Sequence, residues 1–156
     1  RCGPVVGPSF PSPLGRYLRL PAVAVSPVVE LPFCLLHQED AAQAVLAAAH
    51  LRHDGALNVV GPGAVTASQA VRRGGRVPVP VLGPGWWAAG AVAGLLGAPL
   101  PPHTRELLVR GGVADGSEAV DLLGIAPRDT DDVITQLYQW GDVARVATSS
   151  SGTGRS

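Results

Sequence analysis

The alternation of apolar and polar positions changes period several times along the chain, which predicts short strands and helices in turn. Residues 35–36 end a short apolar run, and helical spacing begins directly after the polar cluster that follows. Asp40 is predicted as the N-cap of this helix, with Gln43 in the position of a capping box, and Asp54 and Gly55 as its end. The apolar stripe predicted for this helix is Ala41, Ala44, Val45, Ala48 and Leu51.

A strand is predicted directly after this helix, at residues 55–61, where a buried apolar run is entered and left through glycine. Further extended segments, several of them interrupted by proline, are predicted at 5–6, 23–29, 31–36 and 77–82. Further helices are predicted at 16–20, 67–73, 85–97, 105–110 and 117–123, with Thr66 and Thr104 as N-caps of the second and fourth. Residues 129–132 are predicted to open a last helix, with Val133, Ile134 and Leu137 on its apolar face. The alternation predicts the α/β class.

Composition agrees with a soluble globular protein, because 46% of the 156 residues are hydrophobic and the formal net charge is zero. This balance excludes a basic nucleic-acid surface. All 12 basic residues are arginine, so Schiff-base chemistry on lysine is excluded. The start at Arg1 without a methionine predicts a piece of a longer protein or a processed product. Cys2 and Cys34 are expected to be free thiols in a reducing, cytoplasmic environment, although a bridge between them stays an alternative.

Residues 77–100 carry no charged side chain, which raises the question of a membrane segment. Prolines confine the helix in this stretch to 85–97, about 13 residues and ~20 Å long. A bilayer core is ~30 Å thick, so a membrane span is unfavoured. A buried or partner-facing helix is therefore predicted, and a membrane-associated protein that uses 77–100 is kept as an alternative.

Histidines offer the first candidate chemistry. His37 lies beside Glu39 and Asp40 at the end of a strand, where it could act as a general base or hold the turn by hydrogen bonds, and the structural role is favoured. His50 and His53 are three residues apart, as zinc ligands can be. No carboxylate or cysteine pairing accompanies them, so no metal site is predicted and both are placed on a solvated face.

Four short patterns occur in an order that resembles the extended short-chain dehydrogenase/reductases, the NAD-dependent epimerase/dehydratase family. They lie at 1–8, at 35–44 with His37-x-x-Asp40-x-Ala42-x-Ala44, at 55–61 with Gly55-x-x-Asn58-Val59, and at 115–127 with Leu123-Gly124-x-x-Pro127. The resemblance implies that residues 1–146 form the C-terminal, substrate-binding lobe together with the last strand-helix units of an incomplete Rossmann-like NAD(P)-binding fold. Residues 147–156, rich in serine and glycine, are expected to be a disordered tail.

The resemblance also implies where ligands would bind. The cofactor, NAD or NADP, is expected near the backbone of Cys2 and Gly3, and substrate near Pro4 and Val5. Family members commonly place an asparagine where Pro4 stands. Phe33 stands where they commonly place an arginine for the sugar-nucleotide diphosphate, so it is a substrate-site position with altered chemistry. Arg76 stands where relatives sometimes contact a substrate phosphate.

No catalytic residue is predicted, because the family's Tyr-x-x-x-Lys is absent and Gly61-Pro62-Gly63 does not make a glycine-rich phosphate loop. The chain alone is expected to be inactive and to bind NAD(P) weakly or not at all. The implied activity is that of an NAD(P)-dependent oxidoreductase acting on a nucleotide sugar or a similar hydroxyl or keto compound. Its partners would be that small molecule and a missing N-terminal Rossmann half. A homodimer with a second copy of the chain is a further possibility. A non-catalytic regulator or interaction protein of the same family is the alternative reading.

Overall fold

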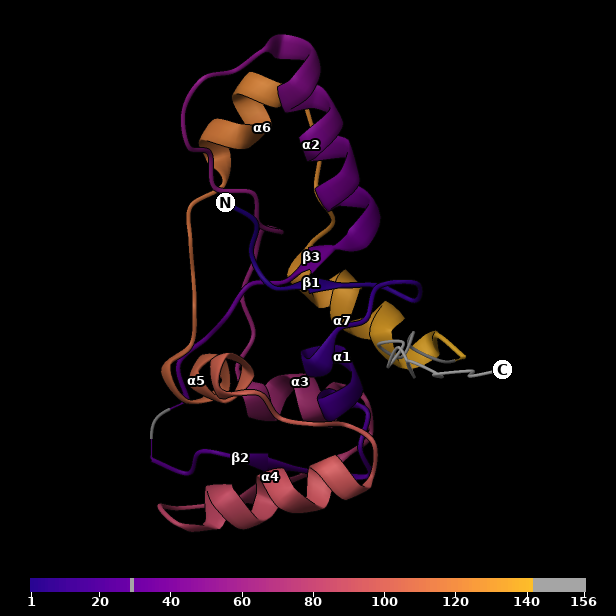
Figure 1. Ribbon diagram of the computed structural model, residues 1–156, viewed down its shortest axis with the longest axis vertical. Coiled ribbons are helices and arrows are strands. Elements are labelled where there is room, and N and C mark those ends of the chain that lie inside the picture. The colour runs from indigo at the N-terminus through magenta and orange to yellow at the C-terminus, as the bar shows by residue number, and fades with distance from the viewer. Residues whose placement is uncertain (29, 142–156) are drawn as a thin grey trace, which may run out of the picture.

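The computed structural model describes residues 1–28 and 30–141, which form an elongated α/β structure (Figure 1). The strands are β1 (Val5–Val6), β2 (Ala22–Val25), β3 (Leu36–His37) and β4 (Val77–Pro80). The helices are α1 (Pro13–Leu18), α2 (Gln38–Leu51), α3 (Ala67–Arg73), α4 (Gly85–Leu95), α5 (Pro102–Arg110), α6 (Ser117–Leu123) and α7 (Thr130–Gln139). The predicted α/β class is confirmed. The tail predicted at 147–156 lies outside the described residues.

Two short parallel sheets organise the chain. β1 pairs with β3, with Val5 opposite Leu36, and β2 pairs with β4, with Ala22 opposite Val77. The strand predicted at 55–61 is wrong in detail, because Val59 makes only a single bridge with Cys2 and the amide of Gly61 donates to the carbonyl oxygen of Leu35. This segment bonds to two different neighbours in turn, so no continuous ladder forms along it.

The elements gather at two ends of the molecule (Figure 1). α2 and α6 lie at one end, α3, α4 and α5 at the other, and extended segments run between them. The smaller apolar cluster holds α2 and α6 together through Leu36, Ala44, Leu57, Val59, Ala119 and Leu123. The larger core joins α1, α3, α7 and β2, and its most buried side chains include Leu18, Val23, Val71, Ile134 and Leu137.

α2 begins and ends differently from the prediction. Its N-cap is His37, whose Nδ1 accepts from the amide of Glu39, because the carboxylate of Asp40 instead accepts from the amide of Arg128. The helix ends at Leu51, before the predicted Asp54 and Gly55, and its C-cap Arg52 adopts a left-handed conformation with φ of 50°. Ala44 is buried as expected, but the predicted stripe residues Val45 and Leu51 are 62% and 58% exposed. α6 and the segment around Leu57 cover only the alanine side of α2.

Local capping signals elsewhere mostly hold. Thr66 caps α3 as predicted, with a complete capping box to Gln69. The acidic segment 129–132 opens α7 as predicted, and the structure identifies Asp129 within it as the N-cap. The prediction that Thr104 caps the next helix is wrong, because Pro102 already occupies the first position of α5 and leaves Thr104 buried within the first turn. α1 likewise starts earlier than predicted, at Pro13, with Ser12 as its cap.

The side chain of Tyr17 forms hydrogen bonds with the edge of β2 that does not pair with another strand. Its hydroxyl donates to the carbonyl oxygen of Ala24 at 3.2 Å and accepts from the amide of the same residue at 3.1 Å. The opposite side of the strand bonds to β4, so the phenol takes the place of another strand. Burial raises the pKa of Tyr17 to about 12.

The uncharged stretch at 77–100 contains β4 and then α4, close to the predicted helix. Within the described ranges, no helix is both long and apolar enough to cross a bilayer.

Candidate functional site

A cavity of about 370 Å³ lies between the start of the chain, α1 and α5, and we call it the inter-lobe cavity. Cys2, Gly3, Pro4 and Val5, the residues predicted to meet cofactor and substrate, all line it. The other described residues of its wall are Phe10, Ser12, Pro13, Leu14, His103, Thr104 and Leu107. The fold therefore brings four of the six predicted site residues into one place.

Hydrogen bonds on two sides hold the first residues in position. The amide of Gly3 donates to the carbonyl oxygen of Val59 at 2.9 Å, and the amide of Leu36 donates to that of Pro4 at 3.0 Å. A Cβ on Gly3 would lie 2.9 Å from a side-chain carbon of Val60, so only glycine fits without a shift. The backbone on this wall of the inter-lobe cavity is therefore fixed by neighbours at both edges.

The chemistry of the inter-lobe cavity is mainly apolar. His103 and the thiol of Cys2 are exposed, and they are its titratable groups among the described residues. The hydroxyl of Ser12 is engaged, since it accepts from the amide of Gly15 at 3.1 Å. No arginine belongs to the described wall, so these residues supply no cation for a phosphate group.

Phe33 and Arg76, the other two predicted site residues, lie away from the inter-lobe cavity. Phe33 is fully buried in the larger core, where its amide donates to the carbonyl oxygen of Val65 at 2.9 Å. Arg76 is exposed after the end of α3, close enough to Tyr138 to lower the pKa of its phenol, although burial has the larger effect and raises that pKa to about 12.

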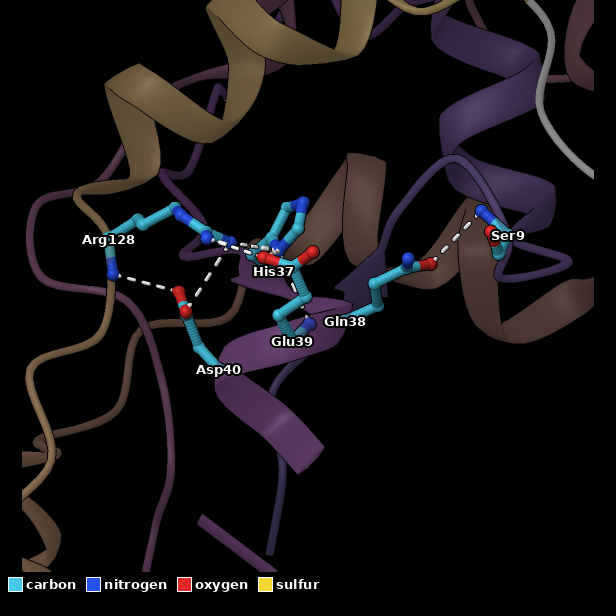
Figure 2. Close-up of polar contacts among 6 residues, drawn as sticks. All are labelled: Ser9, His37, Gln38, Glu39, Asp40 and Arg128. Atoms are coloured by element: carbon cyan, nitrogen blue, oxygen red, sulfur yellow. Dashed lines mark hydrogen bonds and ion pairs between the residues drawn. The ribbon is translucent and has the colours of Figure 1, made fainter. Parts of the chain in front are cut away.

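A polar cluster fixes the junction of β3 and α2 (Figure 2). The guanidinium of Arg128 contacts Nδ1 of His37, binds Oε2 of Glu39 at 2.6 Å and lies 3.4 Å from Oδ1 of Asp40. The amide of Arg128 donates to Oδ2 of Asp40 at 2.9 Å. Gln38 points the other way and accepts from the amide of Ser9 at 3.1 Å. One arginine therefore joins the first turn of α2 to the segment before α7.

This environment favours the neutral form of His37. Burial and the neighbouring Arg128 lower its pKa, and they outweigh the opposing effects of Glu39 and Asp40. The side-chain hydrogen bond from Arg128 also lowers the pKa of Glu39. Nδ1 of His37 is occupied by its role as helix cap, and the side chain is buried, so the predicted structural role is confirmed. Sequence reasoning missed Arg128, because no local pattern links it to residues 88 to 91 positions away.

A larger cavity, of about 760 Å³, opens beside Cys34 and is bordered by the segments 60–64 and 113–117. Its two charged wall residues in the described part of the chain are Asp115 and Asp121. The carboxylate of Asp115 is already bonded to the amide of Ser117 at 2.9 Å, and the thiol of Cys34 donates to the carbonyl oxygen of Gly63 at 3.1 Å. His50 and His53 are exposed on and just after α2. In residues 1–28 and 30–141, no three His, Cys, Asp or Glu side chains gather as metal ligands would.

No protein-family model matches the chain. Uncharacterized proteins of Mycobacterium tuberculosis and Mycobacterium bovis are each 40% identical to it over 88 residues. The match covers 56% of this chain and 23% of each of those proteins. The matched segment therefore spans less than a quarter of the length of these relatives.

Solved structures give a likeness in fold. A UDP-glucose 4-epimerase from Thermotoga maritima superposes with a TM-score of 0.54 and 17% identity, over 90% of this chain and 44% of the epimerase. A UDP-N-acetylglucosamine 4-epimerase from Bacillus cereus superposes with a TM-score of 0.51 and 16% identity, over 89% of this chain and 46% of the epimerase. The chain thus has an α/β fold like part of a Rossmann-like epimerase, and it spans less than half of each neighbour's length.

Proposed function

We propose that this chain is the substrate-binding portion of an NAD(P)-dependent epimerase/dehydratase-type oxidoreductase, acting on a nucleotide sugar or a similar hydroxyl or keto compound. The observation that carries the proposal is the inter-lobe cavity, in which Cys2, Gly3, Pro4 and Val5 face α5. The fold likeness to two UDP-sugar epimerases supports it. In this proposal the cofactor lies against Cys2 and Gly3, and substrate lies between Pro4, Val5 and His103.

The described wall of the inter-lobe cavity does not fit the phosphates of a dinucleotide. A diphosphate needs fixed cationic or amide donors, and the wall offers neither an arginine nor a glycine-rich loop at a helix start. In this proposal, phosphate binding depends on residues outside this wall, and hydride transfer depends on a Tyr-x-x-x-Lys that these 156 residues do not contain. We therefore assign to this chain the enclosure of substrate and derive no reaction step from it.

The missing residues would belong to an upstream Rossmann half that packs beside Arg1 and α2. A small cavity of about 170 Å³ opens there, with Arg1, Cys2, Val45 and Leu57 in its wall. Val45 and its neighbour Leu46 are 62% and 61% exposed on α2, although both are large apolar side chains. An additional layer on this side would bury them, as Rossmann-like sheets are covered on both faces.

A second candidate function is a non-catalytic regulator built on the same fold. Two observations favour it: Pro4 has neither an amide hydrogen nor a polar side chain, and Phe33 is buried away from the inter-lobe cavity. Such a protein would bind a dinucleotide or a partner protein without turning over a substrate. Turnover by the protein that includes the upstream region distinguishes the two candidates.

The test uses the longer protein that contains this chain, with NAD and NADP and with UDP-glucose and UDP-N-acetylglucosamine as probes. His103→Trp fills the inter-lobe cavity from its exposed wall, and we expect it to weaken binding of the UDP-sugar by about tenfold or more, since pocket shape governs affinity. Arg110→Trp is the matched control, because Arg110 is exposed on α5, the same helix as His103, but does not belong to the cavity wall. Titration calorimetry measures affinity, and chromatographic separation of the sugar-nucleotide products measures turnover, because an epimerase or dehydratase returns the hydride and leaves no net reduced nicotinamide.

Equal affinities of the His103→Trp and Arg110→Trp variants would contradict the assignment of the inter-lobe cavity. Binding of the dinucleotide without turnover of either sugar nucleotide, or of simpler hydroxyl and keto compounds, would favour the regulator instead.

A further inference from the structure

α4 is attached to the molecule along one side only. Trp86, Ala89 and Ala93 pack against the larger core, and Ala93 is 2% exposed. Trp87 and Leu95 on the outer side are 81% and 88% exposed, the highest values among the large apolar side chains of the described residues. An uncovered apolar face of this kind marks an interaction surface.

The outer face of α4 is symmetric about its middle. Trp87, Ala91 and Leu95 are spaced four residues apart, so they form one row along the helix, with a small residue between two large ones. When two such helices pack antiparallel about Ala91, Trp87 of one meets Leu95 of the other, twice. Ala88 then faces Gly94, and both are exposed and small. A face that complements itself in this way is what a two-fold interface requires.

The glycines of α4 are a second observation that favours an interface on this helix. A Cβ at Gly90 or Gly94 would meet nothing within 4 Å, so packing inside the chain does not require glycine at either position. Glycine is nevertheless unfavourable in a helix interior compared with alanine. Gly85 differs, because its Cβ would lie 2.5 Å from Val81 and the chain itself demands glycine there. Close approach of a second helix explains Gly90 and Gly94.

The lack of charge on the outer face of α4 and its position in the molecule favour a second copy of the chain as its partner. Residues 77–100 contain no charged side chain, so two copies can meet here without burying an unpaired charge. The same lack of charge gives a charged partner or an anionic lipid nothing to pair with. The edge at Arg1 and α2 lies toward the other end of the molecule (Figure 1), so an upstream half packed there would leave α4 open.

We propose that α4 is a homodimer interface, in which it packs antiparallel against α4 of a second copy with Trp87 opposite Leu95. The proposal uses no residue of the inter-lobe cavity, and it rests on the proposed function only in placing the upstream half beside α2 and not on α4.

Sedimentation equilibrium of the full chain across the micromolar range tests the interface. We expect a monomer-dimer equilibrium that Leu95→Glu weakens by about 100-fold or more, since each dimer would bury two unpaired carboxylates. Trp87→Arg is expected to weaken it similarly. The double variant carrying both changes should recover dimerisation, because the antiparallel arrangement places each new arginine beside a new glutamate. Leu122→Glu on α6, at a leucine that is 48% exposed, is the matched control and should dimerise like the unmodified chain.

Circular dichroism confirms that each variant keeps its helices. A chain that stays monomeric throughout the range would overturn the proposal, and so would dimerisation that survives Leu95→Glu or is equally lost with Leu122→Glu. Failure of the double variant to recover would overturn the antiparallel pairing. Binding of the monomer to neutral phosphatidylcholine vesicles, lost with Leu95→Glu, would assign the face to a lipid surface instead.

Discussion

At the residue scale, His37 joins three parts of the chain through one ring. It ends β3, caps α2 through Nδ1 and contacts Arg128 from the segment before α7. Its ring also lies 5.7 Å from that of Trp140, just past the end of α7. Both contacts at Nδ1 require that nitrogen to accept, so they depend on the neutral ring.

Acid should therefore weaken the fold at this residue. The pKa of His37 is lower in the folded chain than its ordinary value of 6.5, so the unfolded chain binds more protons as the pH falls. The stability due to neutral His37 is complete above pH 6.5 and is lost as the pH falls toward the lower folded-state value. Arg128, Glu39 and Asp40 face the ring, and of these Arg128 adds to the effect.

Urea unfolding at a series of pH values measures this loss. His37→Asn is the comparison, because asparagine can cap a helix but does not titrate. The unmodified chain should lose more stability than the variant between pH 7 and pH 5, near the histidine range. Parallel pH profiles for the two chains would refute the role given to His37.

Single-residue predictions from the sequence succeeded where the partner is local. Thr66 caps its helix through an amide three residues on, so a short pattern contains the whole interaction. Asp40 failed as a cap because its carboxylate is bound by Arg128, far along the chain. Competition between a local and a distant partner is not visible in a sequence window.

At the scale of elements, Arg128 holds the first turn of α2 against the connection between α6 and α7. Asp40 is 5% exposed, and it would keep only the backbone amide of residue 128 as a donor if the guanidinium were removed. Arg128→Ala should therefore lower the free energy of unfolding by about 1–2 kcal/mol, a value reduced for the partial exposure of the arginine.

Thermal or urea unfolding measures the change, with Arg110→Ala as control. Arg110 pairs with Glu106 on the exposed face of α5, and such a pair contributes only about 0.3–0.5 kcal/mol. Arg128→Lys should recover part of the loss, since an ammonium keeps the charge but not the forked geometry. Equal effects of the Arg110 and Arg128 changes would contradict this account.

Element boundaries were predictable for helices with a full apolar face and less so for strands. Val133, Ile134 and Leu137 are all fully buried in α7, as their spacing predicts. In α2, however, the apolar spacing did not tell which side is covered, because Ala44 is buried and Val45 is not. Which side a helix buries depends on the elements that happen to lie beside it.

At the scale of the whole molecule, large apolar side chains are exposed at both ends, on α2 and on α4. We expect Val45→Glu to lower the free energy of unfolding of the longer protein by about 1–3 kcal/mol, because a carboxylate would be buried against the upstream half. The same change in the 156-residue chain should alter stability by no more than about 0.5 kcal/mol, since Val45 is 62% exposed there.

Val77→Glu on β4 is the matched control, because Val77 is 61% exposed and belongs to the sheet at the other end. It should leave the longer protein and the shorter chain similarly stable by urea unfolding. A loss of the same size for Val45→Glu in both proteins would show that no upstream region covers α2.

The candidate site was partly predictable at this scale. Residues 2–5 were found because they are consecutive, so one pattern places all of them on one wall of the inter-lobe cavity. Its opposite wall, from His103 to Leu107, comes from α5 about a hundred residues later, and no local pattern connects the two. Phe33 and Arg76 were assigned by position in the sequence, whereas the fold turns them elsewhere.

Tyr17, whose hydroxyl bonds to the unpaired edge of β2, stays protonated far above the pH range in which histidine titrates, because burial raises its pKa to about 12. The hydrogen bonds of Tyr17 to β2 therefore do not change on mild acidification. The hydrogen bonds of His37 at the start of α2 do change, because its ring becomes protonated. Acidification should therefore destabilise the start of α2 first and leave the hydrogen bonds of Tyr17 intact, so that local unfolding begins at the α2 end of the molecule.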